Sequence, residues 1–407
     1  MIAGGGIGGL AAALALSRRG HRVTVLESRP EFTELGAGIQ VAPNGFHALD
    51  RLGVGTSVRE RAVYVDDLRL MDGLSGEAVA VLPLGDAYRR RFGNPYAVMH
   101  RYDLYEPLLT ACRDADGVEL VAGCRVAGYT QSGRTVTAVL SDGREVRGDA
   151  LVGADGINSA VRGRLLGDGP PRVSGHTIHR SVIPMDVVPA DLRRNGATVW
   201  AGPGWHVVHY PIARGTLLNL AATLDDRATE AVAGRPAARE QVVAAFPGIA
   251  EAPRRLLELA RDWRTWVLCD RDPTDRWADG RVVLLGDAAH PMLQYAAQGA
   301  CQALEDAVVL ADLVGSGDDP ARAFEHFAGL RRTRTSAAQL VARTIGERLY
   351  HPSGEAARER NALLAGLTPA DLHDKVAWLH GERCGAGPGR TPMSLRPSML
   401  QESHAHR

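Results

Sequence analysis

Three glycines near the start of the chain, in the spacing Gly4-x-Gly6-x-x-Gly9, constrain its fold more than any other feature. They follow a short apolar segment and precede an Ala- and Leu-rich segment that predicts a helix. A β-branched segment, residues 22–27, predicts a strand that ends in the acidic residue Glu27. Strand, glycines, helix, strand and acid in this order are typical of a βαβ unit that binds a dinucleotide.

Each residue of this pattern has a physical role in such a unit. Gly4 permits the tight turn, Gly6 lets the backbone approach a pyrophosphate, and Gly9 lets the helix pack closely on the strand. The carboxylate of Glu27 would accept hydrogen bonds from an adenosine ribose. A glycine-rich turn without function is the alternative, and the complete order of elements argues against it. The first strand is very short, which leaves open whether residues precede Met1.

A second candidate ligand loop lies far along the chain. Residues 281–285 predict a buried strand, and an amphipathic run up to residue 314 predicts a helix. The residues of interest in this connection are Gly286, Asp287, Pro291, Gly299 and Ala300. A helix that begins there offers free backbone N–H groups and a positive dipole end to an electron-rich ligand. We therefore predict that this loop and the N-terminal glycines hold the two ends of one dinucleotide, FAD.

Two further residues are candidates for cofactor contacts. Arg101 precedes a predicted helix, where its guanidinium could pair with a phosphate or cover the edge of an isoalloxazine ring. The alternative for Arg101 is a surface arginine at a helix end. Asp155 lies in the turn Gly153-Ala154-Asp155-Gly156 after a buried strand, a position typical of a nucleotide or sugar contact. The alternative for Asp155 is an Asx-type turn.

Residues 173–266 differ from the rest because they predict repeated short strands separated by Pro and Gly turns. This pattern indicates a mainly antiparallel sheet inserted in the nucleotide-binding domain. Within it, alternation puts His206 and Tyr210 on one face of a strand and His209 on the other. His206 and Tyr210 could line a pocket, and a hydrogen-bonded histidine on an ordinary sheet surface is the alternative.

These elements predict an α/β fold: a Rossmann-type FAD-binding domain with an inserted, mainly antiparallel β-sheet substrate domain and C-terminal helices. The predicted FAD-binding domain is discontinuous and comprises residues 1–65, 98–172 and 268–330. The predicted substrate domain comprises residues 66–97 and 173–267. A C-terminal helical region is predicted for residues 331–382, and a loose tail for residues 383–407.

Two local predictions complete the description of the chain. Residues 118–145 alternate apolar and polar side chains between Gly-containing turns, which predicts a meander of antiparallel strands. The long helical stretch 320–350 carries several arginines that we predict to form a solvated face. These arginines are Arg331, Arg332, Arg334 and Arg343.

Composition excludes several classes of protein. Lys+Arg and Asp+Glu are equal at 47 each, so the net charge does not indicate a nucleic-acid partner. The five cysteines are scattered and form no CxxC or CxxH pair, which argues against a disulfide framework or a zinc site and favours a reducing compartment. No apolar run approaches the ~20 residues of a membrane span, and the N-terminus does not resemble a secretory signal. We therefore expect a cytoplasmic protein.

Taken as a set, the N-terminal glycines with Glu27, the turn 153–156 and the run Gly286-Asp287-Ala288-Ala289-His290-Pro291 resemble a known family. This family is the flavoprotein aromatic hydroxylases of the p-hydroxybenzoate hydroxylase fold, single-component monooxygenases that use FAD. The resemblance covers roughly residues 1–378. It is greatest to the 3-hydroxybenzoate 6-hydroxylase and salicylate hydroxylase branches, and the supporting stretches are Gly36–Gly45, His206–Pro211 and Pro291–Tyr295.

The resemblance implies roles for the candidate cofactor residues. Arg101 would contact the flavin, and Asp155 would lie in the turn that serves both FAD and the pyridine nucleotide. Asp287 would hold the ribityl chain, and Pro291 would belong to the loop over the flavin. In relatives Glu27 is often followed directly by a basic residue, whereas Ser28 follows it here, which weakens any assignment of adenosine contacts beyond Glu27 itself.

The resemblance also implies a substrate site. His206, Tyr210 and Gln294 match substrate-pocket positions, with His206 as the candidate base for a phenol, because histidine is tunable near neutral pH. Tyr210 would orient the substrate, and Gln294 would add a hydrogen bond. The backbone N–H groups of Gly299 and Ala300 would stabilise negative charge on the reduced flavin.

The implied activity is an FAD-dependent, NAD(P)H-consuming monooxygenase that hydroxylates a small, hydroxybenzoate-like aromatic substrate through a flavin C4a-hydroperoxide. The co-substrates would be O2 and either NADH or NADPH. The sequence leaves open whether the protein forms a homodimer. One alternative keeps the fold but changes the reaction to epoxidation or dehydrogenation of a non-phenolic substrate. Another is a flavin-free NAD-binding oxidoreductase or a non-catalytic nucleotide binder.

Overall fold

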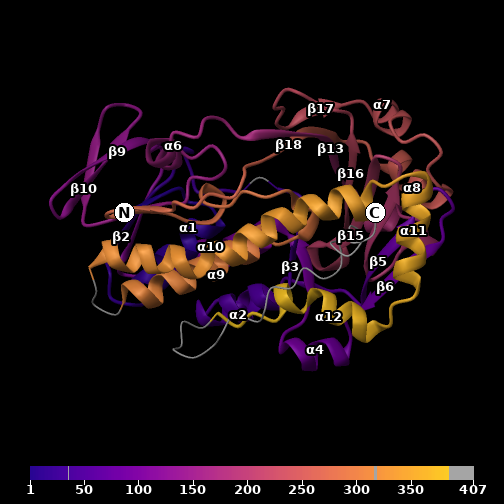
Figure 1. Ribbon diagram of the computed structural model, residues 1–407, viewed down its shortest axis with the longest axis horizontal. Coiled ribbons are helices and arrows are strands. Elements are labelled where there is room, and N and C mark those ends of the chain that lie inside the picture. The colour runs from indigo at the N-terminus through magenta and orange to yellow at the C-terminus, as the bar shows by residue number, and fades with distance from the viewer. Residues whose placement is uncertain (35, 316–318, 385–407) are drawn as a thin grey trace, which may run out of the picture.

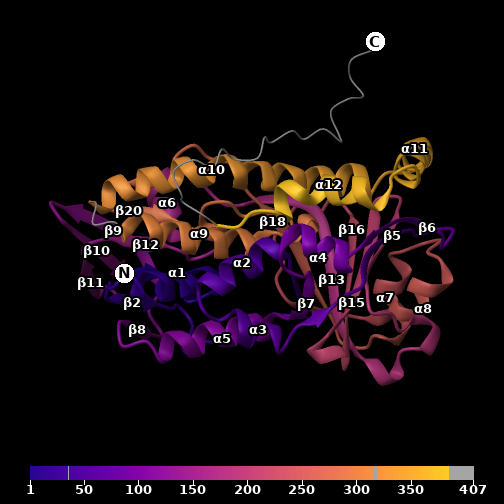
Figure 2. The same ribbon diagram turned by 90° about the horizontal axis from the view of Figure 1, so that it is seen from below.

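The computed structural model describes residues 1–34, 36–315 and 319–384 (Figure 1). Two sheets lie at opposite ends of the molecule, and helix α10 (Pro320–Thr344) runs along its length between them (Figures 1 and 2). The smaller sheet is mainly parallel and is associated with helices, whereas the larger sheet is mainly antiparallel. The predicted α/β fold class, with an antiparallel sheet and C-terminal helices added to a Rossmann-type unit, is confirmed.

The parallel sheet has six strands within the described residues. Their order across the sheet is β19 (Ala278–Asp279), β20 (Val282–Leu284), β12 (Leu151–Gly153), β1 (Ile2–Ala3), β2 (Val23–Leu26) and β8 (Val118–Val121). All neighbouring pairs are parallel except β19 and β20. The central strand β1 has only two residues, and both of them pair with β12 on one side and with β2 on the other. The turns that carry the N-terminal glycines, Glu27 and Asp155 therefore emerge at one edge of the sheet.

Helices α1 (Ile7–Ser17) and α5 (Arg101–Arg113) pack against this sheet, and α9 (Gly299–Val314) packs against α1. The residues of α1 are almost all Ala, Leu or Gly, and most of its positions are buried. Such small side chains let α1 lie directly against both the sheet and α9. The predicted helix after the Gly286 loop is confirmed as α9, which begins at Gly299.

The antiparallel sheet has eight strands in the part of the chain that the structure describes. Their order is β17 (Arg235–Ala237), β18 (Trp263–Asp270), β13 (Arg172–Pro184), β16 (Leu217–Asp225), β15 (Trp205–Ile212), β14 (Ala197–Gly202), β5 (Asp67–Asp72) and β6 (Ala78–Pro83). Only β14 and β5 pair in parallel. Helices α7 (Arg239–Ala244) and α8 (Glu251–Leu259) cover the face that carries Val207. The opposite face, with Tyr210, packs against the core of the parallel-sheet unit.

Two three-stranded sheets complete the strands of the described residues. One contains β3 (Gly38–Val41), β7 (Ala97–His100) and β4 (Val63–Tyr64), and the other contains β11 (Glu145–Gly148), β10 (Thr135–Leu140) and β9 (Val126–Ser132). The remaining helices are α2 (Pro43–Arg51), α3 (Gly55–Arg59), α4 (Asp86–Phe92), α6 (Ala160–Leu166), α11 (Gly354–Ala365) and α12 (Pro369–His380). The predicted meander is therefore correct for β9 to β11 and wrong for β8, because β8 pairs in parallel with β2.

The predicted solvated arginine face of α10 is wrong for three of its four members. Arg331 is only 4% exposed and forms ion pairs with Glu305 and Asp306 of α9. Arg334 also pairs with Glu305, and the side chain of Arg343 is mostly buried against Asp270. Arg332 is the most exposed of the four, with 39% of its side chain accessible to solvent. The polar side of α10 faces acids of a neighbouring element, which the pattern within one helix does not reveal.

The predicted loose tail, residues 383–407, is wrong for Cys384, the last residue that the structure describes. Cys384 is buried, and its carbonyl oxygen accepts a hydrogen bond from Arg51. Residues 385–407 lie outside the described residues. None of the described helices combines the length and the apolar character that a bilayer crossing requires. The boundaries that we assign to the domains remain predictions.

Candidate active site

A cavity of about 280 Å3 lies at the carboxyl ends of β1, β2 and β12. Its lining includes Gly4, Gly6, Glu27, Arg101 and Asp155, all of which the sequence nominated for cofactor contacts. The strands end side by side because they are parallel neighbours in one sheet. Open α/β sheets bind their ligands at this edge. The structure thus brings three segments that are distant in sequence to one site.

The glycines at this edge leave room for a ligand. A Cβ on Gly9 would lie 1.9 Å from the carbonyl oxygen of Gly4, so α1 approaches the turn as closely as a glycine allows. Gly4 has a φ of +101°, which other residues rarely adopt. A Cβ on Gly6 would meet nothing within 4 Å, and Gly6 is the N-cap of α1 with no side chain bonded to the first turn. Open space beside uncapped N–H groups fits the pyrophosphate of a dinucleotide.

Glu27 braces the glycine turn from the end of β2. Its Oε2 accepts a hydrogen bond of 2.7 Å from the backbone N–H of Gly5, and its Oε1 accepts one of 2.8 Å from Arg29. The carboxylate therefore holds two backbone segments of the cavity wall together. Its contact with an adenosine ribose remains a prediction.

The protein contacts of Arg101 and Asp155 are compatible with a cofactor contact and also with an ordinary structural role for each residue. Arg101 forms an ion pair of 2.9 Å with Glu34, and its side chain is 41% exposed where it borders the cavity. Asp155 accepts hydrogen bonds from Ser159 and from the backbone N–H of Ala160, so it caps the start of α6 as an Asx-type turn does. Burial raises the pKa of Asp155. The cofactor contacts of both residues remain predictions.

Buried polar groups hold the Gly286 loop in place. Asp306 of α9 accepts hydrogen bonds from the backbone of Gly286 and from Nε2 of His290, at 3.1 and 2.6 Å. Burial alone would raise the pKa of Asp306, but the neighbouring His290 and Arg331 lower it to about 2. This carboxylate is thus held ionised at the base of the loop, and Arg331 of α10 supports it.

Two further side chains fasten the carbonyl groups of this loop. Nη1 of the buried Arg162 donates to the carbonyl oxygens of Ala288 and Ala289, at 3.0 and 2.8 Å. Gln339 donates to the carbonyl oxygen of Pro291 at 3.1 Å. The loop is therefore held from α6 as well as from α9 and α10, which gives its exposed residues a defined position.

Asp287 is the residue of this loop that stays exposed. Its Oδ1 would lie 3.8 Å from a Cβ placed on Gly299, so Asp287 stands beside the start of α9. The N-cap of α9, Gln298, makes no side-chain capping bond, which leaves the first N–H groups of Gly299 and Ala300 open. An acceptor next to open donors fits a ribityl chain and a flavin ring. These contacts, like that of Pro291, remain predictions.

His206 lies on the face of the antiparallel sheet that points toward this loop. It is 1% exposed, its Nδ1 is 2.8 Å from Nε2 of His351, and its ring centroid is 5.1 Å from that of Tyr295. Its Nε2 has no hydrogen-bond partner among the described residues. Burial, followed by the nearby His351 and His176, lowers the pKa of His206 well below its ordinary value. The ring is therefore neutral, and in the tautomer whose Nδ1 donates to His351 its Nε2 is an acceptor.

Tyr210 lies four residues further along β15 on the same face. A Cβ on Gly38 would be 2.5 Å from the Tyr210 ring, so the backbone of β3 passes directly over it. The N–H of Gly38 donates to Oδ1 of Asn219 at 2.8 Å, which fixes that approach. Burial raises the pKa of Tyr210, so its hydroxyl stays protonated and can donate a hydrogen bond.

Gln294 meets this sheet face through a residue that sequence reasoning missed. Its Oε1 accepts a hydrogen bond from Nη2 of Arg180 on β13, and the next residue, Tyr295, packs on His206. His351 was also missed, because the C-terminal region carries no motif that marks it. The π-helical turn Ile345–Tyr350 that precedes His351 is a conformation often found at functional sites, but it is visible only in the structure.

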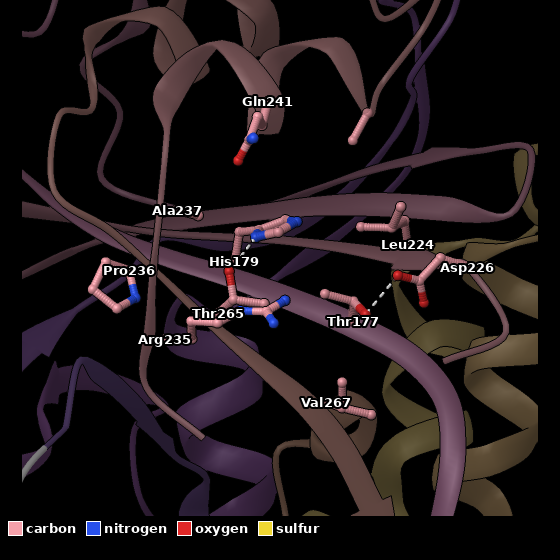
Figure 3. Close-up of a pocket in the computed structure, with 11 residues that line it drawn as sticks. Thr177, His179, Leu224, Asp226, Arg235, Pro236, Ala237, Gln241, Thr265 and Val267 are labelled. Carbon is pink, nitrogen blue, oxygen red and sulfur yellow. Dashed lines mark hydrogen bonds between the residues drawn. The ribbon is translucent and has the colours of Figure 1, made fainter. Parts of the chain in front are cut away.

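A second cavity, of about 470 Å3, lies on the opposite face of the antiparallel sheet (Figure 3). Thr177 and His179 of β13 line it, and they alternate with Arg180, which points to the other face. Their polar atoms are bonded locally: His179 to Thr265 at 2.8 Å and Thr177 to Asp226 at 2.7 Å (Figure 3). None of the residues nominated from the sequence lines this cavity.

Known proteins resemble the chain over nearly its whole length. The 3-hydroxybenzoate 6-hydroxylase 1 of Aquipseudomonas alcaligenes is 48% identical over 382 residues, which cover 94% of this chain and 97% of that protein. The 3-hydroxybenzoate 6-hydroxylase of Polaromonas naphthalenivorans (strain CJ2) is 44% identical, with coverage of 95% and 96%.

Solved structures and a family profile agree with these relatives. A salicylate hydroxylase in complex with its substrate superposes with a TM-score of 0.81 at 27% identity, covering 95% of each chain. Klebsiella pneumoniae HpxO in complex with FAD and uric acid superposes with a TM-score of 0.80 at 27% identity, covering 92% of this chain and 95% of that one. Residues 1–316 match the profile of the FAD binding domain family. The chain therefore belongs to the FAD-binding-domain family of flavoproteins, as the glycines, the Asp287 loop and the fold led us to predict.

Proposed function

We propose that this protein is an FAD-dependent monooxygenase that hydroxylates a small phenolic carboxylate, with 3-hydroxybenzoate as the leading candidate, using O2 and NADH or NADPH. The observation that carries the proposal is the buried, neutral imidazole of His206 on the sheet face opposite the Gly286 loop. The names of the relatives at 48% and 44% identity support the substrate, and position 6 is the expected site of hydroxylation.

Bound FAD would supply the activation of O2 with electrons taken from the nicotinamide. The contribution of the chain is to bind and orient the phenol and to remove its proton. Nε2 of His206 accepts the phenolic proton, while Nδ1 stays paired with His351. Loss of this proton makes the ring electron-rich, which an electrophilic oxygen donor requires. The hydroxyl of Tyr210 and the amide of Gln294 orient the substrate in a site that excludes most water.

A substrate screen with product analysis tests this function. The purified protein should be yellow with bound flavin, and 3-hydroxybenzoate should stimulate NAD(P)H oxidation and yield 2,5-dihydroxybenzoate in near-equal amount. Salicylate and 6-hydroxynicotinate are the comparison substrates. NAD(P)H oxidation that yields only hydrogen peroxide with every phenol, or turnover of a non-phenolic alkene instead, would contradict the proposal.

A further inference from the structure

The antiparallel sheet carries a row of three residues that runs between His206 and Tyr210. Strand register places Arg180 of β13 opposite Ala221 of β16, and Ala221 opposite Val208 of β15. Directly opposed residues share a face, so this row lies on the same face as His206 and Tyr210. Val208 is the middle residue of the three that β15 presents there.

This row forms a shallow floor on the sheet. Ala221 has only a methyl side chain, and Val208 is partly exposed, whereas His206 and Tyr210 on either side of it are buried. The backbones of β13 and β15 are separated by one strand, or roughly 10 Å. The larger side chains thus stand around a floor whose width is on the scale of one aromatic ring.

Arg180 is partly buried at this floor, and its guanidinium has no acidic partner among the described residues. Nη2 donates to Oε1 of Gln294, and the guanidinium carbon lies 5.7 Å from the ring centroid of Trp266. Its Nε is buried and makes no hydrogen bond, and no Asp or Glu among the described residues forms an ion pair with it. The buried Arg331, in contrast, is paired with two carboxylates.

Partial burial of an unpaired cation, here with Nε fully buried, carries a desolvation cost that proteins usually compensate with an anion. Gln294 and the face of Trp266 offset part of this cost but carry no net charge. The planar guanidinium presents several N–H donors in a fork that matches the two oxygens of a carboxylate. The missing partner is therefore best supplied by a ligand that brings its own negative charge.

We propose that Arg180 binds the carboxylate of the aromatic substrate and thereby sets its orientation across the sheet. The carboxylate pairs with the guanidinium at one side of the floor, and the phenolic hydroxyl points to His206 at the other side. This inference rests on the proposed function and specifies it: Arg180 selects aromatic acids over neutral phenols. His206 receives the same hydroxyl in both classes of ligand, so Arg180 alone discriminates between them.

The test compares an acid with its neutral amide on the holoenzyme. Dissociation constants of 3-hydroxybenzoate and 3-hydroxybenzamide are measured from the change in flavin absorbance for the parent protein, R180M, R180K and R264M. Arg264 of β18 stands directly opposite Arg180 in the strand pairing, is exposed, and serves as the matched control. Salicylate and salicylamide form a second acid–amide pair.

We expect R180M to weaken 3-hydroxybenzoate binding by about 10- to 100-fold, the effect of losing a charge-assisted bidentate contact. Binding of 3-hydroxybenzamide should change little, R180K should lie between R180M and the parent, and R264M should match the parent. Equal losses for acid and amide, or no loss for the acid, overturn the proposal. If R180M does not retain flavin, the same comparison is made with R180K. The proposal then requires that R180K weakens binding of 3-hydroxybenzoate more than binding of 3-hydroxybenzamide.

The outcome separates this inference from the proposed function. If the parent binds 3-hydroxybenzoate but forms no hydroxylated product, the proposed function is wrong, while the acid–amide comparison still decides the role of Arg180. If hydroxylation occurs and R180M binds both ligands as the parent does, only the assignment of Arg180 is wrong. A parent protein that binds neither phenolic acid overturns both.

Discussion

Nδ1 of His206 lies 2.8 Å from Nε2 of His351, so the C-terminal region supplies a partner to the candidate base. One ring must donate and the other accept, because both are neutral: burial lowers the pKa of His351 to about 4 and lowers the pKa of the buried His206 well below its ordinary value. The residues matched by the family profile end at 316, well before His351. The segment that places His351 beside the candidate base therefore lies outside the residues that match the family profile.

Replacement of His206 tests its role as the base. H206A should retain FAD, whereas ring hydroxylation should fall by roughly 10²–10⁴-fold, the usual cost of removing a general base. NAD(P)H consumption should continue with release of hydrogen peroxide, because flavin reduction does not need the phenolate. The measurement is the ratio of hydroxylated product to NAD(P)H consumed.

His209 provides the matched control for this experiment. It is buried on the same strand, but it points to the opposite face, where it stacks on Trp200. H209A should keep the product ratio of the parent even if its stability falls. An identical product ratio in H206A and the parent would assign the base to another group.

The contact with His351 predicts a shift in the pH profile. The groups packed around His206 are His351, His176, Tyr295 and Tyr350. H351Q removes one of the two neighbours that lower the pKa of His206, so this pKa should rise toward its ordinary value. The acid limb of the hydroxylation rate should then move to higher pH while FAD content stays unchanged.

The check is product formation measured from pH 5 to 8 in the parent, H351Q and H351A. The Gln side chain can still accept a hydrogen bond from Nδ1, so H351Q should remain more active than H351A. H351A leaves Nδ1 without its partner, which should lower the rate by about tenfold. An acid limb that stays in place in both variants would show that His351 only fills space.

Gly6→Val tests the cofactor cradle. A side chain at Gly6 meets no protein atom within 4 Å and would project into the space that we assign to the pyrophosphate. G6V should therefore fold normally but contain little or no FAD. Gly128 of β9 is the control, because a Cβ there also meets nothing within 4 Å and Gly128 does not line the cavity. Equal flavin content in G6V and G128V would contradict the assignment of the space beside Gly6 to the pyrophosphate.

The buried acids of α9 predict an acid-sensitive fold. The neighbouring arginines hold the pKa of Glu305 at about 2 against the opposing effect of burial, and Asp306 is held at about 2 as well. Both folded-state values lie below the unfolded values of 4.5 and 3.8. Their stabilisation is therefore complete above about pH 4.5 and is lost progressively as the pH falls toward 2.

Substitution of Arg331 tests the same network at neutral pH. R331M leaves the two buried acids without their shared cation, so it should lower the free energy of unfolding by about 3–5 kcal/mol. R332M is the control, because the side chain of the adjacent Arg332 is 39% exposed and pairs with neither of the two acids, and its effect should stay within about 0.5 kcal/mol. Denaturant titration at pH 7 measures both. Equal stabilities of R331M and R332M would contradict a supporting role for the network.

Local sequence determined the parts of the site that depend on backbone geometry. Gly4, Gly6 and Gly9 indicated a strand–turn–helix unit because only glycine permits the positive φ and the close approaches of that turn. The short segment with Gly286 and Asp287 likewise predicted a ligand loop before a helix, because turn and helix-start geometry depend on residues close together in the sequence.

Tertiary structure alone decided which polar side chains meet. Arg180 and Gln294, or His206 and His351, lie more than 100 residues apart, so no local period indicates their contact. Arg331 and Arg332 are neighbours of one residue type, yet Arg331 is buried against acids of α9 and Arg332 is partly exposed beside Asp275. Helical periodicity gives the side of α10 on which a residue lies, but the element packed against that side decides whether its charge meets water or a carboxylate.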